Sequence, residues 1–281
     1  MLTFQVIKMP VDDMRTALAT AAGPFDDNLA PRAFAAAQGG FRGRPNAKWL
    51  GSKKALRRMG LKCGAEAFVD ELAVALQGRD TATGAQVLVP NEKGLVTSLD
   101  LRFSAPNSVS WVWCQADAQL QHQLELAMLT AANATLEYMT PALRLVDGHG
   151  PGKGFAAATV LHAMAPELDQ TPPPLLHVHC HLLGVLDGQG TLRPVDPGSL
   201  YEEDATREYG AAARLHLAEE LRNLGFQVRG GLGYQRRYFE IDGVPEGLLR
   251  PEVSSRARCE GPVQEPEYGL DERRRDEYGV Y

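Results

Sequence analysis

PLLHVHCHLL, residues 174–183, carries a histidine at every second position of its centre, with apolar residues between them. Because successive side chains of a β-strand point to opposite faces, this spacing predicts a strand with His177, His179 and His181 on one face. The apolar residues between them predict a second face that packs in the core. A row of imidazoles suits a metal ion, but such histidines can also be polar residues on a solvated face. The pattern alone leaves both interpretations open.

A fourth histidine lies upstream, in TVLHAMAPEL at residues 159–168. Imidazoles from two segments, with His162 as the upstream member, would hold a divalent ion and leave coordination positions open for substrate oxygens. That arrangement suits phosphate chemistry as readily as zinc-dependent hydrolysis. An unrelated zinc hydrolase would also need a general base, and Glu167 is the only close carboxylate.

The composition is that of a chain able to bury a sizeable core. Its 281 residues are 44% hydrophobic, which favours one large domain. The net charge of -6 argues against a protein that coats nucleic acid by bulk charge, although a local basic groove is compatible with it. Four scattered cysteines, at 63, 114, 180 and 259, form no CxxC pair and indicate a reducing, cytoplasmic setting. We find no apolar run typical of a signal peptide or a membrane segment.

Hydrophobic periodicity predicts both helices and strands. Residues 117–139 and the stretch from about Asp204 to Leu224 have the spacing of long amphipathic helices. Residues 95–103, LVTSLDLRF, alternate as a half-buried strand does. The fold class is therefore expected to be α+β.

Turn signals and the end of the chain complete this organisation. Asp187-Gly188-Gln189-Gly190 and Asp242-Gly243 are typical of hairpins, so several strands are expected to be joined antiparallel. Residues 261–281 are rich in Glu, Arg and Tyr and lack apolar periodicity, which predicts a mobile C-terminal tail.

A basic cluster precedes the first long helix and can be either a solvated helix face or a nucleic-acid contact. Its members are Arg42, Arg44, Lys48, Lys53, Lys54, Arg57 and Arg58.

Several blocks of the sequence resemble, in order, those of the TrwC-type (MobF) conjugative relaxases, which share the HUH endonuclease fold. DLRFSAPNSVS at residues 100–110 is similar to the family's DLTFSAPKSVS, and LLHVHCHLLGVLDGQGTLRPVD at 175–196 is similar to its LHTHVVVANV-DG-WR-LD stretch. Further blocks extend the resemblance from about Lys48 to Arg258, and their collinearity makes it specific. It implies a relaxase domain over residues 1–260, with a central, mainly antiparallel sheet and helices packed on one side.

The resemblance also implies a metal site. His177 and His179 match the family's HxH pair, and His162 matches its third ligand. Asp100 matches an aspartate that hydrogen-bonds a metal-side imidazole and orients it. His181 falls where the family has an apolar residue, so it can be a spare ligand, a proton shuttle or a polar filler. The expected ion is Mg²⁺ or Mn²⁺, with Zn²⁺ as the alternative.

The implied activity is metal-dependent nicking and strand transfer of single-stranded DNA from a plasmid or mobile element, in the bacterial cytoplasm. In that chemistry a tyrosine attacks the scissile phosphate, and a 5′-phosphotyrosine retains the bond energy. The implied partners are single-stranded or hairpin DNA and proteins of a relaxosome or conjugation system. Arg102 and Lys153 are our candidates for DNA backbone contacts, and a plain surface role remains open for each.

The chain departs from the family where the nucleophile belongs. Family relaxases carry a tyrosine pair near the N-terminus, whereas this chain has Ala19 and Thr20 near those positions and no tyrosine before Tyr138. Three outcomes are open: another tyrosine attacks, the ion activates water to give a nuclease, or the protein only binds DNA. The mobile candidates for the nucleophile are the tail tyrosines, Tyr268, Tyr278 and Tyr281. Three other tyrosines are expected to be structural: Tyr201, Tyr209 and Tyr238.

Overall fold

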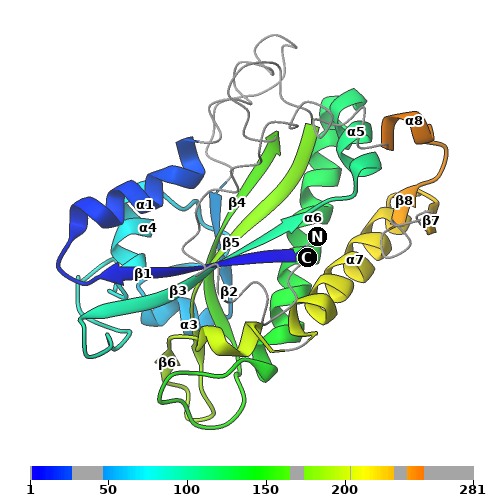
Figure 1. The fold of residues 1–281 in the computed structure, drawn as a ribbon. Helices are drawn as coiled ribbons and strands as arrows, with labels where there is room; N and C mark the ends of the chain where they lie inside the picture. Colours follow the sequence, from blue (N-terminus) through cyan, green and yellow to red (C-terminus); the bar gives the residue numbers. More distant parts are fainter. Residues whose placement is uncertain (1, 27–46, 165–173, 203, 231–238, 250–281) are drawn as a thin grey trace, which may run out of the picture.

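The structure is a computed structural model that describes residues 2–26, 47–164, 174–202, 204–230 and 239–249. In this part of the chain a six-stranded antiparallel sheet lies between two groups of helices (Figure 1). The sheet order is β1-β3-β5-β4-β2, and β6 pairs with β5. The strands are β1 (Leu2–Pro10), β2 (Ala47–Gly51), β3 (Leu95–Ser104), β4 (Phe155–Met164), β5 (Pro174–Leu186) and β6 (Leu192–Arg193).

Helices cover both faces of the sheet, and a two-stranded ribbon lies beside them. The helices are α1 (Met14–Asp26), α3 (Lys53–Arg58), α4 (Val69–Leu76), α5 (Asn107–Gln115), α6 (Ala118–Met139), α7 (Ala205–Asn223) and α8 (Glu246–Leu249). Short 3-10 turns occur at η1 (Thr140–Ala142) and η2 (Pro197–Leu200), and the ribbon consists of β7 (Val228–Gly230) and β8 (Phe239–Ile241). The predicted α+β class with a mainly antiparallel sheet is confirmed.

Strand β5 forms the centre of the sheet, between β3 and β4. The predicted alternation holds: Val178 and Cys180 point into a hydrophobic core, while the histidines point to the opposite face. Strand β3 alternates in the same way, with Leu101 and Phe103 in that core. The predicted strand at residues 95–103 is thereby confirmed.

A hydrophobic core lies on each side of the sheet, so the expectation of helices on one side alone is wrong. The first core joins the sheet to α5, α6 and α7, and the second joins it to α1, α3 and α4 (Figure 1). The second core forms because the histidine face of β5 turns apolar at Leu183 and Leu186, where it meets Trp49 of β2. That apolar surface needs a cover of its own.

Both long helices agree with their predicted bounds. The Asp117 carboxylate accepts a hydrogen bond from the backbone N–H of Leu120 (2.8 Å) and caps α6. Beyond α7, Gly225 has a φ of +90°, a conformation that glycine adopts without strain, and it ends the helix.

Of the two predicted hairpins, one is confirmed. Asp187 turns β5 into β6, and its Oδ1 accepts hydrogen bonds from the backbone of Gln189 and Thr191 (2.9 Å each). Asp242-Gly243 does not join two strands, because it ends β8 and leads into α8. The partner of β8 is β7, which precedes it in the chain.

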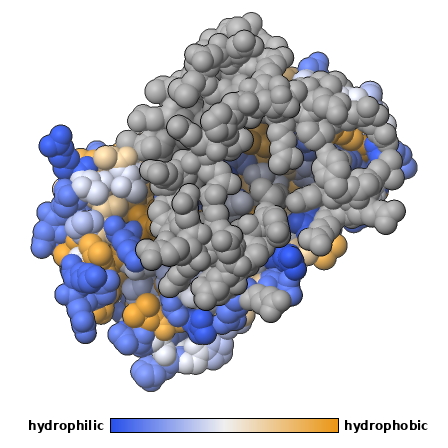
Figure 2. All heavy atoms as spheres, viewed as in Figure 1, coloured by the Kyte–Doolittle hydropathy of each residue, from blue (hydrophilic) through white to orange (hydrophobic). Residues whose placement is uncertain are grey.

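On the face that Figure 2 shows, the described atoms that flank the grey residues are largely hydrophilic, with hydrophobic atoms in small patches. No helix in the described ranges has the length and apolar character of a membrane span.

Candidate metal centre

Three histidines from two adjacent strands converge on one face of the sheet. His162 of β4 and His177 of β5 are directly opposite in the antiparallel register, and His179 follows two residues along. The three ring centroids are 4.8 to 5.3 Å apart. One candidate ligand atom from each residue lies within 4.8 Å of the others, and all three side chains are buried.

Hydrogen bonds fix the tautomer of two of these rings. The Nδ1–H of His177 donates to the Leu175 carbonyl (2.8 Å), and the Nδ1–H of His179 donates to Asp100 (2.9 Å to Oδ2). Each ring therefore keeps a free lone pair on Nε2, which is the atom a metal ion needs. The buried Nε2 of His162 has no hydrogen-bond partner among the described residues.

The electrostatics of the site favour neutral rings. Burial, together with the neighbouring histidines, lowers the pKa of His162 to about 2, and burial lowers the pKa of His177 to about 3. Burial alone would raise the pKa of Asp100, but His181, His179 and Arg102 outweigh it, so the net direction is downward. Neutral imidazoles backed by an ionised carboxylate are the donor set of a divalent metal site. The described residues therefore fit such an ion.

Arg102 and His181 extend the polar face of the sheet. Arg102 of β3 is directly opposite His179, and His181 is directly opposite Asp100. The Nε of Arg102 and both ring nitrogens of His181 are buried and have no described hydrogen-bond partner. The positive charge of Arg102 also lowers the pKa of His162 and of His177, which places that charge close to them.

A segment to which the sequence analysis gave no structural role, from the end of β3 into α5, clamps the start of β5. Leu176, next to His177, donates its N–H to Ser110 Oγ (3.0 Å) and accepts a hydrogen bond from the Ala105 N–H (2.9 Å). Both partners lie in the SAPNSVS block, so that block positions the first histidine of β5. Its serines are the signal that sequence reasoning could have used.

A buried carboxylate supports the same segment. The Ser108 N–H at the start of α5 donates to Glu240 of β8 (3.0 Å), and Ser108 Oγ accepts from the Ile241 N–H (2.8 Å). A negative charge at a helix N-terminus is favourable. No spacing rule links residues 132 positions apart, so this pair carries no sequence signal.

Comparison with known proteins agrees with this site. A sequence model of the family described as TrwC relaxase matches residues 33–268. The chain belongs to the TrwC relaxase family. No curated protein sequence matches it.

The fold of this TrwC-family chain is similar to solved relaxase structures. One is conjugative relaxase TrwC in complex with oriT DNA in a metal-bound structure, at 21% identity and a TM-score of 0.66, covering 100% of this chain and 90% of that one. A copper-bound structure of the TrwC–oriT complex has 23% identity and a TM-score of 0.65, covering 97% and 86%. TrwC with a 27-mer DNA that contains the recognition hairpin has 22% identity and a TM-score of 0.63, covering 97% and 85%. The predicted HUH relaxase fold is confirmed.

The other candidate DNA contact, Lys153, lies at the far end of the sheet of this relaxase domain. It lies two residues before β4, whose opposite end carries His162, so about 30 Å of extended chain separates Lys153 from His162. Its Nζ donates to the Gly188 carbonyl in the β5–β6 turn (2.9 Å), and Lys54 of α3 lies against Gly190 of the same turn. The structure thus brings Arg102, but not Lys153, to the metal centre. The described members of the basic cluster, Lys48, Lys53, Lys54, Arg57 and Arg58, are exposed, whereas Arg42 and Arg44 lie outside the described residues.

The described tyrosines of this relaxase domain lie on the opposite face from the histidines. Tyr201 packs edge-on against Phe4 (5.0 Å between centroids), which contacts the first core, and Tyr209 is buried in that core. Tyr138 of α6 donates to Glu208 of α7 (2.6 Å). The structural roles expected for Tyr201 and Tyr209 agree with these contacts. Tyr238 and the tail tyrosines at 268, 278 and 281 lie outside the described residues, as does Glu167.

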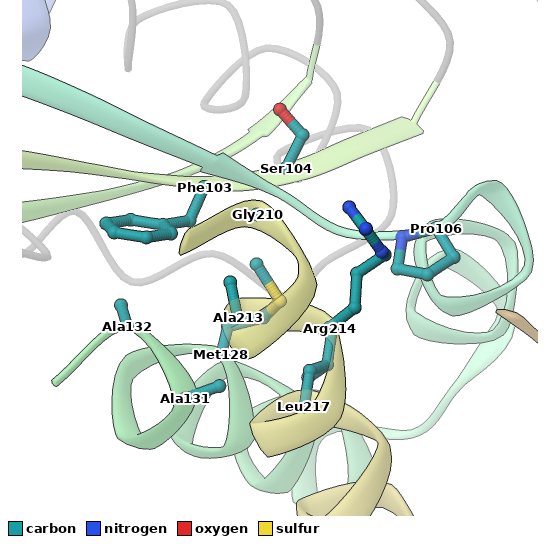
Figure 3. Close-up of a pocket in the computed structure, with 10 residues that line it drawn as sticks. All are labelled: Phe103, Ser104, Pro106, Met128, Ala131, Ala132, Gly210, Ala213, Arg214 and Leu217. Carbon is teal, nitrogen blue, oxygen red and sulfur yellow. The ribbon is translucent and has the colours of Figure 1, made fainter. Parts of the chain in front are cut away.

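A small cavity also lies on that opposite face, between the end of β3 and helices α6 and α7 (Figure 3). Its walls are mainly small or apolar, and Arg214 is the one charged side chain among its lining residues. None of the four clustered histidines reaches it. The cavity and the histidine cluster therefore lie on opposite faces of the sheet.

Proposed function

We propose that this relaxase domain nicks and transfers single-stranded DNA in a metal-dependent reaction. The observation that carries the proposal is the convergence of three buried imidazoles, in which hydrogen bonds to Nδ1 of His177 and His179 leave the Nε2 atoms of both rings free. A protein that only binds DNA has no need of such a donor set. Membership of the TrwC relaxase family supports the same activity.

Each residue of the site has a proposed role. His162, His177 and His179 would hold a divalent ion, which when bound polarises the scissile phosphate and offsets its developing negative charge. Asp100 holds the His179 ring by accepting the hydrogen bond from its Nδ1. Arg102, beside His179 and partly buried, would bind a non-bridging phosphate oxygen with its guanidinium.

The identity of the ion follows from the donor atoms. Imidazole nitrogen is a good ligand for transition ions and a poor one for Mg²⁺, which prefers oxygen. We therefore favour Mn²⁺ or Zn²⁺ over Mg²⁺ at this site. The copper-bound TrwC structure supports a transition ion in this fold.

The proposed nucleophile is a tyrosine outside the described residues, with Tyr268, Tyr278 and Tyr281 as candidates in the tail proposed for residues 261–281. Its phenolate oxygen would attack phosphorus, form a 5′-phosphotyrosine and release the 3′-hydroxyl of the upstream strand. The positions where the family carries its tyrosines, near Ala19 and Thr20, lie within α1, which contains no tyrosine.

A second candidate function follows from that replacement. Without a tyrosine on α1, the same domain could bind single-stranded or origin DNA without cutting it. A water-using nuclease is the third outcome, since a bound ion can activate water. The metal centre alone serves all three functions, and only the reaction products separate them.

The proposed partners are single-stranded or hairpin DNA and the proteins of a relaxosome or conjugation system, in the bacterial cytoplasm. DNA lying across the histidine face would meet Arg102. A longer strand or a hairpin stem would reach Lys153 and the exposed lysines of α3 at the far end of the sheet.

The test uses the full chain, end-labelled single-stranded DNA and Mn²⁺ or Zn²⁺, with denaturing gels run before and after proteinase treatment. We expect a covalent protein–DNA adduct that proteinase converts to a shorter labelled product and that a chelator abolishes. Replacing His179 by Ala should also abolish it, while His149→Gln, a change in an exposed histidine, should not. Free cut ends would indicate hydrolysis, and DNA binding without cleavage would establish the silent alternative.

A further inference from the structure

A second group of metal-ligating side chains lies beside the first on the same sheet face. Asp100 of β3 and His179 and His181 of β5 each have one candidate ligand atom within 4.8 Å of the others. Their exposed fractions are 7%, 4% and 2%. His179 thus belongs to both groups, with His162 and His177 on one side and Asp100 and His181 on the other.

His181 is the unusual member of this second group. It is directly opposite Asp100 in the β3–β5 register, yet neither ring nitrogen has a hydrogen-bond partner among the described residues. Burying two unpaired polar atoms is costly, so a buried ring in this state needs a reason. A polar filler or a solvated histidine, both of which the sequence left open, would not be buried without a partner.

We propose that Asp100, His179 and His181 form a second metal site, in which His179 bridges two divalent ions through its two ring nitrogens. The site shares His179 with the first centre, and so rests on the part of the proposed function that assigns a metal there. It does not depend on DNA cleavage. In this second site His181 is a metal ligand, and Asp100 binds the ion directly.

The geometry supports two ions bridged by His179, rather than one ion that occupies either the first group or the second. The Nδ1 of His179 already faces the Asp100 carboxylate (2.9 Å), and its Nε2 is the free atom of the first group. With metal–nitrogen distances of about 2.0 Å at each end of one imidazole, the two ions would be about 6 Å apart. The candidate ligand atoms of the second group, which lie within 4.8 Å of one another, would move closer together around an ion by side-chain rotation.

Binding of the second ion displaces one proton from the bridging ring. The second ion replaces the Nδ1 proton of His179, and that proton leaves to solvent. His179 then carries one negative charge and Asp100 another, which together offset half of the charge of two divalent ions. Ser98 lies two residues before Asp100 on the same face, and its buried Oγ has no described partner, so it offers a further oxygen beside the site. Carboxylate and imidazole donors suit Zn²⁺ or Cu²⁺.

The test counts bound ions. The full chain is stripped with a chelator, loaded with Zn²⁺, freed of excess ion, and measured by native mass spectrometry and elemental analysis. We expect two ions per chain for the wild type, one for His181→Val, and one for His162→Ala, which retains the second site. The exposed His149→Gln variant should keep two.

Cu²⁺ loading gives a second measurement, made on the wild type and on His181→Val. Two copper ions joined through one imidazole are exchange-coupled, so the ordinary single-ion electron paramagnetic resonance spectrum should be lost at full loading and should return in His181→Val. One ion per wild-type chain, or two in both wild type and His181→Val, would overturn the second site. A protein that holds two ions but does not cut DNA would refute the proposed nicking and leave the second site standing.

Discussion

Acid should destabilise the metal-free protein well above the pH at which its carboxylates titrate. His162 and His177 have pKa values of about 2 and about 3, against 6.5 for an unperturbed histidine. Below pH 6.5 the unfolded chain binds protons at these residues and the folded chain does not. Their contribution to stability is therefore complete above pH 6.5 and is lost as the pH falls toward the folded-state values.

The size of the effect follows from the number of rings. Lowering the pH from 7.5 to 5.5 costs about 1.4 kcal/mol for each histidine that stays neutral in the folded state. His162 and His177 together give about 3 kcal/mol, and burial lowers the pKa of His181 as well, which acts in the same direction. A loss of that size is a large part of the stability of an ordinary domain.

The assay is urea unfolding in the presence of a chelator, followed by circular dichroism at pH 7.5 and at 5.5. His162→Gln should reduce the pH-dependent loss by about the share of one histidine, or 1.4 kcal/mol. His149→Gln, in an exposed side chain, should leave the loss unchanged. Equal free energies of unfolding at the two pH values would refute the conclusion that the folded rings are neutral and buried.

Three further changes test the surroundings of the site. Asp100→Ala should weaken metal binding by about 10- to 100-fold, because His179 loses its hydrogen-bond acceptor. The change is made in a His181→Val background, so that only the first ion binds, and competition with a chromophoric chelator measures the affinity. Arg102→Ala should weaken binding of single-stranded DNA and make binding less sensitive to salt, while the number of bound metal ions stays the same. Fluorescence anisotropy at two salt concentrations measures this, and an equal salt dependence of binding for the wild type and the variant would contradict it. Glu240→Ala should lower the free energy of unfolding by about 1 to 3 kcal/mol, because the buried Ser108 N–H loses its acceptor; an unchanged urea midpoint would exclude that role.

The strands at the centre of the sheet could be predicted from the sequence because their constraint is local. A buried strand with one polar face must alternate, so HVHCH and LDLRF specify both the strand and the direction of each side chain. The same alternation correctly placed the histidines on one face, and His162, which the resemblance to relaxases proposes as the third ligand, lies beside them on the neighbouring strand.

What the sequence could not show depends on contacts between distant segments. The cover of α1, α3 and α4 on the histidine side results from the meeting of Leu183, Leu186 and Trp49, which belong to different strands. The pairing of Ser108 with Glu240 joins segments 132 residues apart. At Asp242-Gly243 the turn residues were recognised correctly, but a turn signal does not say whether a strand or a helix follows.

The metal centre and the missing nucleophile belong to separate parts of the fold. The histidines are held by β3, β4 and β5, by the carboxylate of Asp100 and by the segment that clamps Leu176. The positions where the family carries its tyrosines lie in α1, which packs mainly on α4 and contributes no ligand to either histidine group. Substitution in α1 therefore removes no candidate ligand and none of the described hydrogen bonds that orient the rings. A chain without tyrosines in α1 can for this reason keep the whole histidine cluster, and a nucleophile supplied from elsewhere would find the proposed ligands already in place.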